Sequence, residues 1–173
     1  MQMKKKFPCV LFLLIMLSLF LTGCFSLSIN KEISRSLGIY LPLKSVINYE
    51  DDHGGFHGDG VTIANVQFED GVAEDVLLQI QNNKDWKPTP LSENMTLEFY
   101  GGEESKDVYY ASDLAEKNNM PEINNGYWIF IDRFNGENRL TEGEELFSRS
   151  SKNYTSGIYD SENNKLYYFQ YDS

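Results

Sequence analysis

The sequence predicts an α+β fold, in which an antiparallel sheet of about five strands carries a helix packed on one face. Two alternating segments flank a glycine-rich loop at 51–60, which indicates a hairpin. An amphipathic segment at 70–82 follows, and the last third of the chain holds three more strand-like segments. Strands close in sequence favour antiparallel pairing, and a helix between them crosses a face of their sheet.

The first hairpin combines a strand over Ser45–Glu50 with a strand over Val61–Phe68. Asp70 is predicted to cap the helix that follows, which reaches about Asn82. The apolar residues of this segment recur at helical spacing and form one stripe: Val72, Ala73, Val76, Leu77 and Ile80.

The middle third is less regular. Met95–Tyr100 is compatible with either a short helix or a strand. Residues 101–106 are polar and predict a loop, and a short helix over 111–118 ends before Pro121.

The last third contains the strongest strand, Tyr127–Asp132, which the turn dipeptide Asn125-Gly126 opens. Tyr154–Asp160 and Leu166–Tyr171 flank a polar turn and predict a second hairpin. Aromatic side chains occupy both faces of these strands, because neighbouring strand residues point to opposite sides. This pattern favours a sheet that is covered on both sides over one with an exposed aromatic platform for a glycan or peptide.

The N-terminus has the order of a secretory signal. Lys4, Lys5 and Lys6 precede an apolar run over residues 10–21, and small residues precede a cysteine. Leu21-Thr22-Gly23-Cys24 resembles a bacterial lipobox. That resemblance implies cleavage after Gly23 and attachment of acyl chains to the thiol of Cys24.

The chain therefore divides into a lipoprotein signal peptide at 1–23, a short membrane-proximal segment at 24–43 and a single α+β domain at 44–173. Within the membrane-proximal segment, Asn30 is predicted to cap a helix that runs through Leu37 and that Gly38 ends.

Cleavage after Gly23 leaves 150 residues with 12 basic and 26 acidic side chains, a formal charge of −14, because the signal carries only its three lysines. Such a charge disfavours nucleic acid and anionic lipid headgroups as partners. It allows divalent cations, a cationic peptide or a neutral envelope glycan. Cys9 leaves with the signal and Cys24 carries the lipid, so no disulfide forms, and a monomer is expected.

Both histidines of the chain lie in the glycine-rich loop. His53 and His57 stand beside Asp51 and Asp59, and imidazole and carboxylate groups are ligands for zinc and other divalent transition metals. His53, His57 and Asp59 are therefore candidate ligand-binding residues, and Asp51 joins them in a candidate metal site. The alternative is structural: glycines shape the turn, the histidines bond to nearby oxygens, and Phe56 packs onto the core.

Several short motifs together carry a resemblance to a known family. They are His53-Gly54-Gly55-Phe56-His57-Gly58-Asp59-Gly60, Trp86-Lys87-Pro88, Gly126-Tyr127-Trp128, Asp132-Arg133, Ile158-Tyr159-Asp160 and Leu166-Tyr167-Tyr168. Over most of residues 45–172 the chain resembles small lipoproteins of Gram-positive bacteria. This resemblance implies export and a lipid anchor, and it implies no particular activity.

Three functions are compatible with these sequence features. The sequence favours a lipid-anchored protein of the outer membrane face that binds or shields a component of the cell envelope without catalysis, because no catalytic constellation stands out and no cofactor is required. A metal-binding protein or metal-dependent enzyme that uses the loop of His53 and His57 is the second. An immunity- or inhibitor-like lipoprotein that captures a cationic partner is the third.

Overall fold

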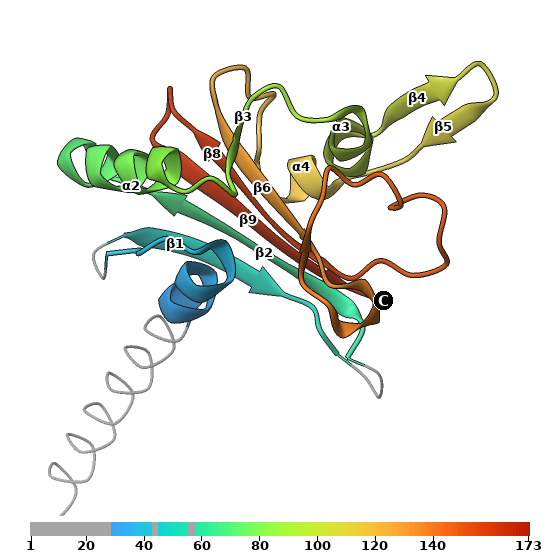
Figure 1. The fold of residues 1–173 in the computed structure, drawn as a ribbon, viewed down its shortest axis with the longest axis horizontal. Coiled ribbons are helices and arrows are strands. Elements are labelled where there is room, and N and C mark those ends of the chain that lie inside the picture. The colour runs from blue at the N-terminus through green and yellow to red at the C-terminus, as the bar shows by residue number, and fades with distance from the viewer. Residues whose placement is uncertain (1–28, 43–44, 55–57) are drawn as a thin grey trace, which may run out of the picture.

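The computed structural model describes residues 29–42, 45–54 and 58–173 (Figure 1). The predicted signal peptide, the lipidation site at Cys24, and Phe56 and His57 of the glycine-rich loop lie outside these residues. Among the described residues, no helix combines the length and the apolar character needed to span a bilayer.

A seven-stranded antiparallel sheet forms the centre of the molecule, and its order is β1-β2-β9-β8-β6-β3, with β7 also paired to β6. Its strands are β1 (Val46–Asp51), β2 (Gly60–Gln67), β3 (Lys87–Pro88), β6 (Gly126–Asp132), β7 (Arg139–Leu140), β8 (Tyr154–Asp160) and β9 (Lys165–Asp172). The α+β class and both predicted hairpins are confirmed. The sheet exceeds five strands because the two-residue strands β3 and β7 extend it beyond β6.

The last strand, β9, lies between β2 of the first hairpin and β8, its partner in the second hairpin. Strand β9 pairs with β2, where Ile63 faces Phe169, and with β8, where Gly157 faces Tyr168. Every residue from Lys165 to Tyr171 has a partner on both sides. A strand buried on both faces needs apolar side chains in both directions, which explains the aromatic character of β9.

Helices cover both faces of the sheet, whereas the sequence predicted a helix packed on one face. The helix over residues 29–37 and α2 (Asp70–Asn82) pack on one face, and α3 (Glu93–Tyr100) and α4 (Leu114–Lys117) pack on the other (Figure 1). The alternating strands β6, β8 and β9 present apolar side chains to both layers. Coverage on both sides, which the aromatic pattern favoured, is confirmed.

The first helical layer joins the N-terminal segment to the sheet. Ile33 and Leu37 are fully buried in the same core as the inward residues of α2. The Trp86 indole donates a hydrogen bond to the Leu37 carbonyl at 3.1 Å. Gly157 leaves room for both residues, since a Cβ there would lie 2.8 Å from Leu37 Cδ1 and 3.0 Å from Trp86 Cη2.

Helix ends partly match the expectation. Gly38 ends the first helix with a φ of 65°, as predicted. Asn30 lies inside that helix instead of capping it, and its side-chain amide donates to the Pro42 carbonyl. The N-cap position of α2 is Glu69, and Asp70 is the first helical residue, so this capping prediction is also wrong by one residue.

The second helical layer resolves the ambiguous middle of the chain. Ser92 caps α3 by accepting a hydrogen bond from the Met95 amide at 3.2 Å, and Phe99 packs against Phe169 with ring centroids 4.6 Å apart. The predicted polar loop is instead strand β4 (Gly102–Ser105), which pairs with β5 (Val108–Tyr110). This hairpin projects away from the main sheet (Figure 1).

Candidate functional site

The glycine-rich loop leaves β1 at Asp51 and enters β2 at Gly60. Its two ends lie close together, because a Cβ on Gly60 would stand 2.6 Å from the His53 Cα. The Asp52 carboxylate accepts a hydrogen bond from the Val61 amide at 2.5 Å. Only glycine allows this approach, and it brings His53 over the end of the sheet.

The His53 ring lies between two carboxylates. Its Nδ1 is 2.5 Å from Asp51 Oδ1, its Nε2 is 3.1 Å from Asp172 Oδ2, and its side chain is 18% exposed. The Thr62 hydroxyl donates to the same Asp51 oxygen at 3.1 Å. An imidazole can donate to an acceptor from both nitrogens only when it is protonated, so this arrangement favours the imidazolium.

The protonation equilibria follow from these contacts. Burial by itself would lower the pKa of His53, but the hydrogen bonds and charges of Asp51 and Asp172 raise this pKa above its ordinary value. Burial would raise the pKa of Asp51, and its bonds from His53, Tyr49 and Thr62 lower that pKa instead. The cluster is thus a set of mutually stabilised charges.

Asp172 joins this cluster to the half-buried Arg133. Its other oxygen, Oδ1, is 2.8 Å from Arg133 Nη1. The same guanidinium donates through Nη2 to the carbonyls of Tyr154 and Tyr171 at 3.0 and 3.2 Å. Burial would raise the pKa of Asp172, but Arg133, Gln170 and His53 lower it. Arg133 and His53 therefore hold the end of β9 from two sides.

The structure brings together part of the candidate metal site. Asp51 and His53 are in contact, Asp59 is exposed, and His57 lies outside the described residues. In the described ranges no three His, Cys, Asp or Glu side chains are placed to hold a metal ion. Both ring nitrogens of His53 already face carboxylates, so metal binding there would require one of these contacts to break.

The sequence did not identify Asp172 as a partner of His53. The two residues are 119 positions apart and meet only because β2 and β9 pair. Likewise, the neighbours Asp132 and Arg133 end the strongest strand but form ion pairs with other residues. Asp132 accepts hydrogen bonds from Nη1 and Nη2 of Arg149 at 2.8 and 2.9 Å, and the Arg149 guanidinium lies over the Phe134 ring.

A second polar cluster is buried under α3. Glu98, 3% exposed, accepts from Lys152 Nζ at 2.6 Å and from the Tyr154 hydroxyl at 2.8 Å. Burial and the neighbouring Glu98 carboxylate raise the pKa of Tyr154 well above its ordinary value, so this phenol stays a hydrogen-bond donor. The cluster joins α3 to the segment before β8.

Comparisons of the chain with protein-family models, with curated proteins and with solved structures find no match. The resemblance to small Gram-positive lipoproteins therefore stays a prediction from the motifs.

Proposed function

We propose that the protein is a non-enzymatic binding or shielding protein of the cell envelope, anchored through lipid on Cys24 to the outer face of the cell membrane. The observation that carries the proposal is the N-terminal sequence, with a basic start, a short apolar run and the lipobox-like Leu21-Thr22-Gly23-Cys24. A diacyl anchor gives stable membrane attachment where a single chain does not.

The position of the first helix supports an anchor that holds the domain close to the bilayer. Ile29, five residues after Cys24, is already buried in the core at 4% exposure. Five residues span at most roughly 18 Å when fully extended. The folded domain would therefore stay beside the lipid headgroups.

The state of His53 supports a role without catalysis. A general base needs a ring nitrogen free to take a proton from a substrate. In the structure both nitrogens of His53 face carboxylates, and Asp172 also bonds to Arg133. We assign this cluster the structural role of joining the glycine-rich loop to the end of β9.

Capture of a cationic partner is the second candidate, and the distribution of charge favours it. In the described part of the chain, the basic residues that lie in ion pairs with acidic ones are Lys87, Lys117, Arg133, Arg139, Arg149 and Lys152. Because these basic side chains are already paired with carboxylates, the remaining acidic side chains dominate the surface. The projecting hairpin adds the exposed residues Glu103 and Glu104 beside Tyr109, which is 70% exposed.

Membrane fractionation tests the anchor. The wild-type protein should resist extraction by high salt and alkali and dissolve in detergent, because acyl chains and not charges hold it. Cys24→Ala should abolish this behaviour. Cys9→Ala, a matched change inside the predicted signal, should not alter it. Membrane retention of Cys24→Ala equal to that of the wild type would refute the anchor.

A charge-neutralisation experiment tests whether the protein captures a cationic partner through the projecting hairpin. The double variant Glu103→Gln/Glu104→Gln should weaken binding of an oligolysine probe at low salt. The control Glu74→Gln/Asp75→Asn removes the same charge from α2. Equal effects of the two pairs would mean that only net charge matters and that the hairpin is no site.

A further inference from the structure

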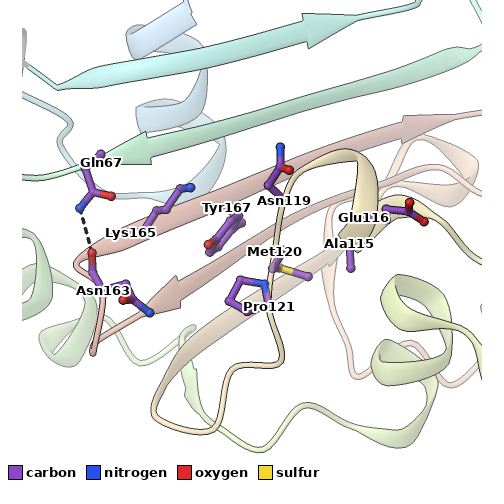
Figure 2. Close-up of a pocket in the computed structure, with 9 residues that line it drawn as sticks. All are labelled: Gln67, Ala115, Glu116, Asn119, Met120, Pro121, Asn163, Lys165 and Tyr167. Carbon is purple, nitrogen blue, oxygen red and sulfur yellow. Dashed lines mark hydrogen bonds between the residues drawn. The ribbon is translucent and has the colours of Figure 1, made fainter.

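A groove lined by both polar and apolar side chains opens on the face of the sheet that α3 and α4 cover. It has a volume of about 630 Å³ and lies between the connection from α4 to β6 and the adjoining ends of β2 and β9 (Figure 2). The groove is wide open to solvent, so a bound ligand would stay partly exposed. Of the candidate residues in the glycine-rich loop, the described Asp51, His53 and Asp59 do not line it.

The floor of the groove contains a buried phenol. Tyr167 of β9 is 2% exposed and lines the groove, and among the described residues its hydroxyl has no hydrogen-bond partner. A hydroxyl that reaches the groove without a protein partner bonds to water, and a ligand oxygen or nitrogen at this position would take the place of that water. Burial and the charge of Asp160 raise the pKa of Tyr167 to about 12, so the hydroxyl remains a donor at neutral pH.

The walls supply neutral amides. Gln67, Asn119 and Asn163 line the groove around Tyr167, and Figure 2 shows the Gln67 amide bonded to the Asn163 carbonyl, at 2.8 Å. The Gln67 amide also donates to the Phe68 and Asn164 carbonyls, and the Asn163 amide donates to Asp160. Among the described wall residues, the Asn119 amide therefore keeps its two donors and its acceptor for a ligand. Amides and a phenol together match ligands that carry several hydroxyl or amide groups.

The charge of the groove differs from that of the domain. Among the described residues that line it, Lys165 and Glu116 are the only charged ones and their charges cancel, whereas the predicted mature chain carries a formal charge of −14. The Lys165 ammonium lies 5.1 Å from the centroid of the Tyr167 ring, where the ring quadrupole attracts it. A neutral ligand therefore fits this groove better than a cation does.

A small apolar surface borders the polar groups. Met120 and Pro121 lie beside Tyr167 in the groove wall (Figure 2), and Ala115 continues this surface. Such a surface accommodates a methyl group next to hydrogen-bonding atoms, which is the composition of an acetamido substituent. The thioether of Met120 adapts readily to the shape of a small apolar group.

The floor disfavours an extended peptide. Peptides commonly add a strand to an unpaired sheet edge or lay an apolar helix face into an apolar groove. Tyr167 belongs to β9, which pairs with both β2 and β8, so its backbone offers no free edge. The apolar residues of the wall are too few to receive a helix.

We propose that this groove binds a neutral glycan that carries acetamido groups, with Tyr167 and Asn119 bonding to the sugar and Met120 and Pro121 contacting the acetamido methyl. This inference deepens the proposed function, because an extracytoplasmic location would bring the groove to envelope glycans.

Calorimetry on the detergent-solubilised full-length protein tests the proposal with two disaccharides. The β-1,4-linked disaccharide of N-acetylglucosamine should bind saturably. Cellobiose, which has the same linkage without acetamido groups, should bind at least about fivefold more weakly. A lost hydrogen bond of about 1 kcal/mol corresponds to that factor.

Two variants locate the binding. Tyr167→Phe removes only the hydroxyl and should weaken binding about fivefold. Asn119→Gly should act similarly and tolerates the left-handed backbone, since Asn119 has a φ of 49°. Tyr127→Phe, whose hydroxyl bonds to Gln81 and whose ring packs on the opposite face of the sheet, should leave binding unchanged.

The absence of saturable binding, equal binding of the two disaccharides, or full binding by Tyr167→Phe would each overturn the proposal. The anchor is tested separately by the fractionation of Cys24→Ala. A protein that is anchored but binds no acetamido sugar would thus refute the groove assignment alone.

Discussion

His53 Nε2 lies 3.1 Å from Asp172 Oδ2, so the loop that follows the first strand of the sheet is joined to the end of its last strand. The contact connects β1 and β9 across β2, which lies between them. Asp51 on one side of His53 and Arg133 on the far side of Asp172 extend it into a line of four alternating charges. This line of charges joins the loop to the end of β9, in addition to the pairing of β1 with β2.

The first prediction concerns pH. Because the pKa of His53 is raised in the folded state, its stabilising effect is complete below the ordinary value of 6.5 and is lost as pH rises through the raised pKa. The lowered pKa values of Asp51 and Asp172 add stability above their ordinary value of 3.8, which is lost on acidification. The contact should therefore stabilise the fold most between about pH 4 and 6.5.

Thermal melts of the wild type and His53→Gln across this range measure the effect. The difference in Tm should be largest near pH 5.5 and should shrink above pH 7. It should correspond to about 1 kcal/mol, since Asp51 is 37% exposed and solvent screens its charge. His57→Gln serves as the control for the other histidine. A difference in Tm that is constant with pH would contradict the ionic contact.

The second prediction concerns the buried cluster under α3. Lys152→Met leaves the Glu98 carboxylate buried without its cation and should lower the free energy of unfolding by about 3 kcal/mol. Lys87→Met is the matched control, because its partner Glu142 is 51% exposed, and it should cost less than about 1 kcal/mol. Urea denaturation gives both values. Equal losses of unfolding free energy in the two variants would show that the buried Glu98–Lys152 pair stabilises the fold no more than the exposed pair does.

The third prediction concerns metal. With both nitrogens of His53 on carboxylates, equimolar zinc should leave the Tm of the protein unchanged. A metal held by His53, His57, Asp51 and Asp59 would instead raise the Tm, because it would add about 2.7 kcal/mol to the free energy of unfolding at a free zinc concentration of a hundred times Kd. Stabilisation by zinc that both His53→Gln and His57→Ala abolish would establish the metal site and refute the structural role.

Local patterns predicted a large part of the fold. The hairpin of β1 and β2, helix α2 and the hairpin of β8 and β9 each follow from periodicity and turn residues within about 25 positions. Met95–Tyr100 remained ambiguous because its apolar residues fit either period. Its helix is decided by the Ser92 cap and by packing of Phe99 on Phe169, a contact between residues 70 positions apart.

The sequence predicted only those contacts of the candidate site that join residues close together in the chain. Asp51 and His53 are neighbours in the chain, so their contact could be expected. Asp172 contacts His53, and Arg133 contacts Asp172, only because β9 lies between β2 and β8, and strand order is not encoded in a local pattern. Tyr167 and Asn119 of the groove were hidden for the same reason, since each reads as an ordinary strand or helix-end residue.

Mass spectrometry of the purified protein's N-terminal peptide tests the lipid anchor most directly. The account predicts a mature chain that begins at Cys24 and carries a diacylglyceryl group on its thiol. The Cys24→Ala variant should lack this modification and retain the signal or be released without lipid. An unmodified Cys24, or a chain that still begins with Met1 in the wild-type protein, would contradict it.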